Sequence, residues 1–148
     1  MQNSEAMALS AALLAVAGEL TQRIHDGVTA RGFDGLRPAH GFAFARLAPD
    51  GATVTELAAH LGVTKQAASQ LVEEIVRKGY AERRPHPEDA RARLIVLTER
   101  GWACTRAAEE AAAEAVRPWV ELLGEREIRS LQHQLLRIAP YGPIKPVW

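Results

Sequence analysis

The sequence predicts a mainly α-helical fold with one small β-hairpin, built as a single domain over residues 1–148. Three observations lead to this prediction. Apolar residues recur at helical spacing over most of the chain, and glycine and proline gather at a few breaks. One short aliphatic run, Leu94 to Leu97, follows a proline-punctuated loop and is rich in β-formers. The length suits one domain or one subunit of an oligomer.

A long first helix is predicted from Ala6 to about Arg31. The residues that recur at helical spacing are Leu13, Leu14, Ala17, Leu20, Ile24 and Val28. The apolar run at its start has no basic residue before Arg23, unlike a secretory signal, and it is shorter than the roughly 20 residues that span a bilayer. We therefore expect a soluble, cytoplasmic protein without membrane contact, and a single cysteine fits a reducing compartment.

Two short helices are predicted next, after a helix that begins at Pro38. Thr53 and Glu56 have capping-box spacing, Gly62 ends the first of the two, and Thr64 can cap the second, which Gly79 stops. The second helix is expected to bury Ala67, Ala68, Leu71, Val72, Ile75 and Val76. Its outer face carries Lys65, Gln66, Ser69, Gln70, Glu73 and Arg77.

This pair of helices is typical of a helix-turn-helix. The alternative is two ordinary packed helices. Gln66, Ser69 and Gln70 favour the first interpretation, because a merely solvated face is more often Glu and Lys. Gln, Ser and Lys side chains can contact base edges and phosphates in a major groove.

A β-hairpin is predicted after the second helix, with strands at Tyr80 to Arg84 and Leu94 to Leu97. A hairpin that follows a helix-turn-helix forms a wing, and a lone hairpin is marginal in water, so it must pack on the helices. Thr98 then caps a long helix in which Pro118 predicts a kink or a break. After Gly124 a last helix is expected from about 125 to 138, followed by an extended tail that Tyr141 and Trp148 dock.

The charge distribution is informative although the chain is neutral, with 18 basic and 18 acidic residues. Residues 63–100 hold eight basic and six acidic side chains, so the positive excess lies in the predicted helix-turn-helix and wing. The sequence contains no phosphate-binding loop, nucleophile elbow or metal motif, and its five histidines have no metal-ligand spacing. We expect neither an enzyme nor a cofactor or metal site.

Residues 51–101 resemble the winged helix-turn-helix of the multiple antibiotic resistance regulator (MarR) family. The similarity is carried by ELAAHLGVTKQAASQLVEEIVRKGY, by ERRPHPEDARA and by LTERG, with Asp89-x-Arg91, five residues, then Leu97-Thr98 as the most recognisable pattern. The resemblance implies a homodimeric regulator of transcription, usually a repressor, that binds a palindromic operator and is released by a small molecule or by oxidation. It places the DNA-binding part at 38–98 and the helical dimerisation part at 5–32 and 99–140.

The resemblance also assigns candidate sites. The residues that it places at DNA are Thr64, Lys65, Gln66, Ser69, Gln70 and Arg91, with Asp89 as support for the wing. Three further arginines of the wing, Arg83, Arg84 and Arg93, are expected either to contact phosphates or to brace the wing. Many relatives carry an arginine where this chain has Gln70. A pocket for a small aromatic ligand would be lined by His40, Phe42, Arg46 and Trp102, although Phe and Trp there also suit a simple core.

Two alternatives remain open at the level of sequence. Cys104 could sense oxidants, but its apolar-leaning helix favours a buried small hydrophobe. The chain could also be a winged-helix protein-interaction or dimerisation module that has no DNA-binding activity.

Overall fold

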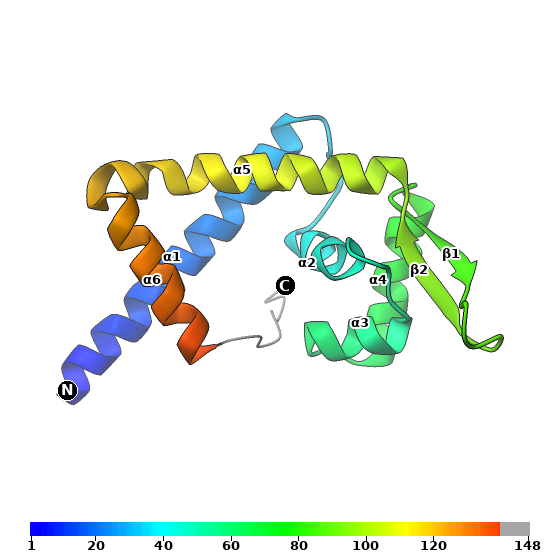
Figure 1. The fold of residues 1–148 in the computed structure, drawn as a ribbon, viewed down its shortest axis with the longest axis horizontal. Helices are drawn as coiled ribbons and strands as arrows, with labels where there is room; N and C mark the ends of the chain where they lie inside the picture. The colour runs from blue at the N-terminus through cyan, green and yellow to red at the C-terminus, as the bar shows by residue number, and fades with distance from the viewer. Residues whose placement is uncertain (140–148) are drawn as a thin grey trace.

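The computed structural model describes residues 1–139 as six helices and one two-stranded antiparallel sheet (Figure 1). The elements are α1 (Asn3–Ala30), α2 (Pro38–Leu47), α3 (Val54–Leu61), α4 (Lys65–Arg77), β1 (Ala81–Pro85), β2 (Arg93–Leu97), α5 (Glu99–Leu123) and α6 (Glu125–Ile138). This is the predicted mainly helical fold with a β-hairpin wing.

The helix boundaries follow from local capping, as predicted. Thr53 accepts a hydrogen bond from the N–H of Glu56, whose carboxylate accepts one from the N–H of Thr53. Thr64 and Thr98 accept from the N–H groups three residues later and cap α4 and α5. Gly62 ends α3 in the left-handed region at φ 65°, where a residue with a Cβ is strained.

The core lies where α2, α3 and α4 meet the base of the wing. Tyr80 is fully buried there, with its ring centroid 5.5 Å from that of Phe44 and the Arg100 guanidinium carbon 4.4 Å from its own centroid. Gly101 allows α5 to start against this core, because a Cβ at that position would lie 2.1 Å from the carbonyl oxygen of Tyr80.

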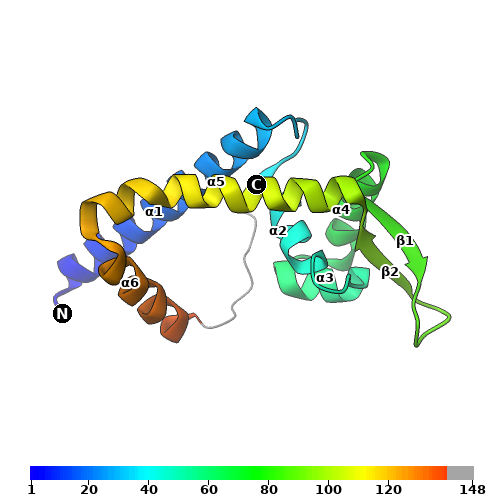
Figure 2. The same cartoon turned by 45° about the horizontal axis from the view of Figure 1, so that its top comes forward.

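The wing packs against the helices, because an isolated two-stranded hairpin is only marginally stable in water. Ala52, in the turn before α3, pairs with Ile95 of β2 through backbone hydrogen bonds of 2.8 and 3.0 Å. Ile95 is fully buried, so one face of the hairpin base belongs to the core. The rest of the hairpin projects beyond the helices (Figure 2).

Helices α1 and α5 cross and form the second part of the molecule (Figure 1). The crossing is close because a Cβ at Gly27 would lie 2.6 Å from the Cβ of Ala111. Arg31 at the end of α1 binds two carboxylates of α5, with 3.2 Å from Nε to Glu110 and 2.7 Å from Nη2 to Glu114.

Large apolar side chains are exposed on α1, on α6 and at the end of α5. Leu14 is 75% exposed and Leu136 is 50% exposed, and none of the residues of α6 is buried. The others in this set are Met7, Leu9, Leu13, Val16, Leu122, Leu123, Leu131, Leu135 and Ile138. Large exposed apolar patches on a single chain mark surfaces that bind a partner or a membrane.

Among the described helices, α1 has the length and apolar composition to cross a membrane, with a mean hydropathy of 1.2 over 18 residues. The apolar run alone was predicted to be too short, but the helix continues well beyond it to Ala30.

Three sequence predictions need correction or lie outside the structure. Ala67 was expected to be buried, but it is exposed, because the buried stripe of α4 runs through Ala68. Of the kink or break predicted at Pro118, the break does not occur, because α5 continues to Leu123 and proline removes only one donor of the ladder. The tail with Tyr141 and Trp148 lies outside the described residues.

Candidate nucleic-acid interface

The outer face of α4 is polar and accessible along its N-terminal half. Lys65, Gln66 and Gln70 are exposed and Ser69 is half-buried, while the opposite face of the helix packs into the core. Lys65 makes no ion pair within residues 1–139, so its ammonium group is available. The predicted candidates on α4 therefore share one accessible surface.

Thr64 sits at the start of this surface as the N-cap. Its hydroxyl oxygen accepts a hydrogen bond of 3.1 Å from the N–H of Ala67, which leaves its O–H free to donate. The positive end of the α4 dipole opens at the same place. A cap and a phosphate contact are compatible roles for this residue.

The wing arginines do not all point the same way. Cross-strand partners share a face of the hairpin, so Arg83 shares the face of Ile95, whereas Arg84 shares the opposite face with Leu94. Arg84 also forms an ion pair with Glu82 two residues earlier on its own strand. Arg93 pairs with Pro85 and lies on the same face as Arg83.

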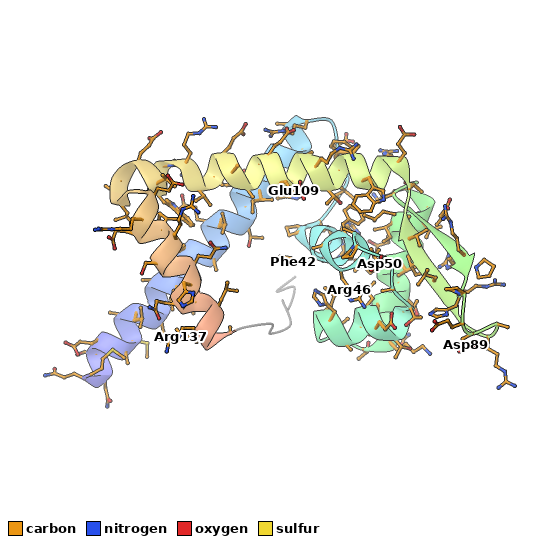
Figure 3. The ribbon with its side chains drawn as sticks, in the orientation of Figure 1. Phe42, Arg46, Asp50, Asp89, Glu109 and Arg137 are labelled. Carbon is orange, nitrogen blue, oxygen red and sulfur yellow. The ribbon has the colours of Figure 1, made fainter. Side chains whose placement is uncertain are left out.

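Asp89 and Arg91 lie at the tip of the wing, with Asp89 at the far end of the molecule from α6 (Figure 3). Asp89 accepts a hydrogen bond of 2.9 Å from the backbone N–H of Arg91 and binds the backbone, so it supports the turn rather than the guanidinium. Within residues 1–139 the Arg91 side chain makes no ion pair and is exposed.

The four residues predicted to line an effector pocket are not brought together. A cavity of about 500 Å³ lies between α1, α2 and α5, and of the four only Phe42 lines it. His40 turns away to contact Glu74 of α4, Arg46 donates to the carbonyl of Gly51, and Trp102 is 40% exposed on another face of α5. The four residues lie on different faces of α2 and α5, and their spacing in the sequence did not show which faces turn toward the cavity.

The cavity is built mainly from residues that the sequence analysis did not assign to a pocket. Leu20, Ile24 and Val28 line it from α1, and Thr105 and Ala108 line it from α5. The wall is largely apolar, and its charged members are Arg37, which precedes α2, and Glu109 of α5. The helical spacing of Leu20, Ile24 and Val28 predicts that one face of α1 packs against other helices. It does not predict that a cavity lies next to that face.

Cys104 lines the same cavity and is 2% exposed. Burial raises the pKa of its thiol to about 11, although the nearby Arg100 acts in the opposite direction. A protonated thiol is a poor nucleophile, so its surroundings are those of a packed small hydrophobe. Among residues 1–139, no group of three or more His, Cys, Asp or Glu side chains is placed to hold a metal ion.

Comparisons with known proteins agree with this geometry. Residues 35–92, which contain α2 to α4 and most of the wing, match the MarR family. The MarR family transcription regulator SP03579 is 25% identical, with a TM-score of 0.73 over 93% of this chain and 92% of that one. No curated protein sequence matches the chain significantly.

Two further solved structures share the fold. MarR from E. coli is 20% identical, with a TM-score of 0.71 over 88% of this chain and 96% of that one. A mutant of MepR from S. aureus, bound to an oligodeoxyribonucleotide, is 21% identical, with a TM-score of 0.60 over 89% of this chain and 96% of that one.

Proposed function

We propose that the chain, whose residues 35–92 match the MarR family, is a regulator of that family that binds double-stranded DNA as a homodimer and represses transcription. The observation that carries the proposal is the polar, accessible N-terminal half of α4 beside a wing whose tip arginine has no ion pair in residues 1–139. The DNA-bound MepR structure, of the same fold, supports DNA as the ligand.

In this proposal α4 enters the major groove. Gln66, Ser69 and Gln70 read base edges, while Thr64 and Lys65 bind phosphates. Arg91 enters the minor groove, where its guanidinium is attracted by the negative potential of A·T-rich sequence, and Arg93 binds the flanking backbone. Arg84 contributes less, because it must first leave Glu82.

The second copy covers the exposed apolar faces of α1, α5 and α6. Burying them against another copy removes apolar surface from water, which stabilises the pair by about 25 cal/mol for each Å². A twofold dimer implies a palindromic operator with half-sites about 10 base pairs apart. The protein would act in the cytoplasm, where bacterial DNA is accessible.

An effector of small aromatic type would occupy the cavity between α1, α2 and α5. The volume of about 500 Å³ is within the range of small-molecule sites, and the largely apolar wall contains a few polar residues: Thr21, His25, Arg37, Thr105 and Glu109. Because α1 and α5 belong to the dimerisation part and α2 to the DNA-binding part, a ligand here would change how the two parts are arranged.

The proposal is tested by a gel shift with DNA from upstream of the protein's own gene. We expect a shifted complex whose affinity falls steeply between about 50 and about 200 mM salt, because phosphate contacts release counterions. Salicylate, a small phenolic acid, is expected to reduce the shift. A stable dimer without salt-dependent DNA binding would instead support the protein-interaction module.

A further inference from the structure

Three side chains join the start of α2 to the middle of α4. His40 of α2 contacts Glu74 of α4 at 2.8 Å from Nε2 to Oε2, and the guanidinium of Arg37 donates to the same carboxylate oxygen at 2.7 Å. We call Arg37, His40 and Glu74 the α2–α4 joint. It connects the helix that borders the cavity to the helix that carries the candidate DNA-reading residues.

The hydrogen bonds of His40 fix its protonation state. Its Nδ1 lies 2.7 Å from the backbone nitrogen of Arg37, whose N–H can only donate, so Nδ1 must be an unprotonated acceptor. The proton of the neutral ring then lies on Nε2, which donates to Glu74. Both ring nitrogens are used, and the joint is complete only with neutral His40.

A second proton on His40 has no acceptor. It would sit on Nδ1 and face the N–H of Arg37, so the cap of α2 would lose one hydrogen bond. The charged groups that face the ring are Arg37, Glu74 and Lys78 at the end of α4. Burial lowers the pKa of His40, Arg37 and Lys78 lower it further, and Glu74 opposes them.

His40 is 1% exposed, and apart from Tyr80 and Cys104 it is the one residue with a polar side chain that is buried among residues 1–139. An apolar residue would fill the same volume without requiring two aligned partners. A second contact ties the same segments together, because Lys78 donates to the carbonyl of Gly35 at 2.6 Å. The joint therefore specifies one position of α4 relative to α2.

We propose that His40 is a positioning residue whose neutral ring joins the start of α2 to α4, and that a proton on Nδ1 displaces the ring from the Arg37 N–H, shifts α4 through the attached Glu74 and weakens DNA binding. The inference rests on the proposed DNA binding. It gives the protein a sensitivity to acid that is built into the DNA-binding part and is independent of any ligand in the cavity.

The direction in which DNA affinity changes on acidification distinguishes this mechanism from a general electrostatic effect. Acidification makes a protein more positive overall, and this strengthens its attraction to phosphates. The shift of α4 acts in the opposite direction. If both protomers must have neutral His40, affinity falls about fourfold at the pH where half of the His40 side chains are protonated, since a quarter of the dimers remain competent.

The experiment measures DNA affinity of the full chain by fluorescence anisotropy at constant ionic strength, from about pH 7.5 to about pH 5. The probe is the upstream fragment that the gel shift identifies. H40Q keeps a donor for Glu74 but does not titrate, and H60Q is the matched histidine control. We expect the wild type and H60Q to lose affinity in acid, and H40Q to keep or gain it. The shape of each profile is compared, not its absolute affinity.

Nitrogen NMR of the histidine rings in the free protein provides a test that needs no DNA. We expect Nδ1 of His40 to be unprotonated near neutral pH, and the amide signals of α4 to shift as that ring titrates. The proposal would be contradicted by a protonated Nδ1 of His40 near neutral pH. It would also be contradicted by α4 amide signals that do not shift while His40 titrates. Equal acid profiles for the wild type and H40Q would contradict it as well. Failure of the wild type to bind any DNA would instead reject the proposed function and leave the NMR result to decide the joint.

Discussion

Asp89 accepts a hydrogen bond of 2.9 Å from the backbone N–H of Arg91 at the tip of the wing. The carboxylate is thus occupied by the turn, and the guanidinium two residues later is left exposed. The cluster of charge in the sequence PHPEDARAR therefore separates into one residue that shapes the turn and one that is available to a ligand.

Arg91→Ala is expected to weaken operator binding by about 1–3 kcal/mol, because it removes a minor-groove contact without changing the turn. Anisotropy titrations at fixed salt measure the effect. Arg84→Ala, at a residue paired with Glu82, is expected to cost less. Asp89→Asn should retain more affinity than Asp89→Ala, since an amide oxygen still accepts from the N–H. Equal affinity of Arg91→Ala and the parent would show that the wing tip does not contact DNA.

Gly101→Ala is expected to destabilise the fold by about 1–3 kcal/mol, as overpacked core substitutions do. The added Cβ would lie 2.1 Å from the carbonyl oxygen of Tyr80, which is backbone and cannot rotate away. Urea unfolding followed by circular dichroism measures the change. Gly18→Ala is the matched control, because a Cβ there meets nothing within 4 Å and a helix gains about 0.5–1 kcal/mol from the substitution. Equal stability of the two variants would contradict the close packing at the base of the wing.

Cys104 is expected to resist thiol reagents and peroxide in the folded protein at neutral pH. Its side chain is 2% exposed and burial raises its pKa to about 11, so the reactive thiolate is scarce. Ellman's reagent, added with and without denaturant, measures accessibility. Fast labelling of the native protein, or loss of DNA binding after mild peroxide treatment, would favour a redox role.

Stability is expected to fall in acid in two separate ranges of pH. Burial lowers the pKa of His40 below its ordinary value of 6.5, so the unfolded chain takes up the proton first and stability decreases as pH falls below 6.5. The Arg37 hydrogen bond lowers the pKa of Glu74 below 4.5, so its contribution is lost only as pH falls below that value. Urea titrations at several pH values measure both, and the first decrease should be absent in His40→Gln.

Deletion of residues 125–148 is expected to give monomers, because it removes α6 with its exposed apolar face. Light scattering after gel filtration measures the mass. Leu131→Glu combined with Leu135→Glu is a gentler test, since both residues are exposed in the single chain and their replacement leaves its core intact. A dimer that survives both changes would place the interface elsewhere.

The local features of the sequence determined where the helices begin and end. Thr53, Thr64 and Thr98 cap helices within three residues of themselves, and Gly62 needs only its own backbone conformation. These interactions are short in sequence, so their spacing predicts them. The hairpin was predicted in the same way, within one residue of its observed strands.

The tertiary structure decided which faces meet. Ala67 and Ala68 are adjacent and chemically identical, and only packing shows that Ala68 is buried. His40 looked like a pocket residue, yet it contacts Glu74, which is 34 residues away and carries no local signal of the pairing. The cavity likewise needs α1, α2 and α5 side by side. The sequence by itself determined the elements and their caps, because those depend on neighbouring residues. Only the tertiary structure determined the α2–α4 joint and the cavity, because both depend on how separate helices are rotated against one another.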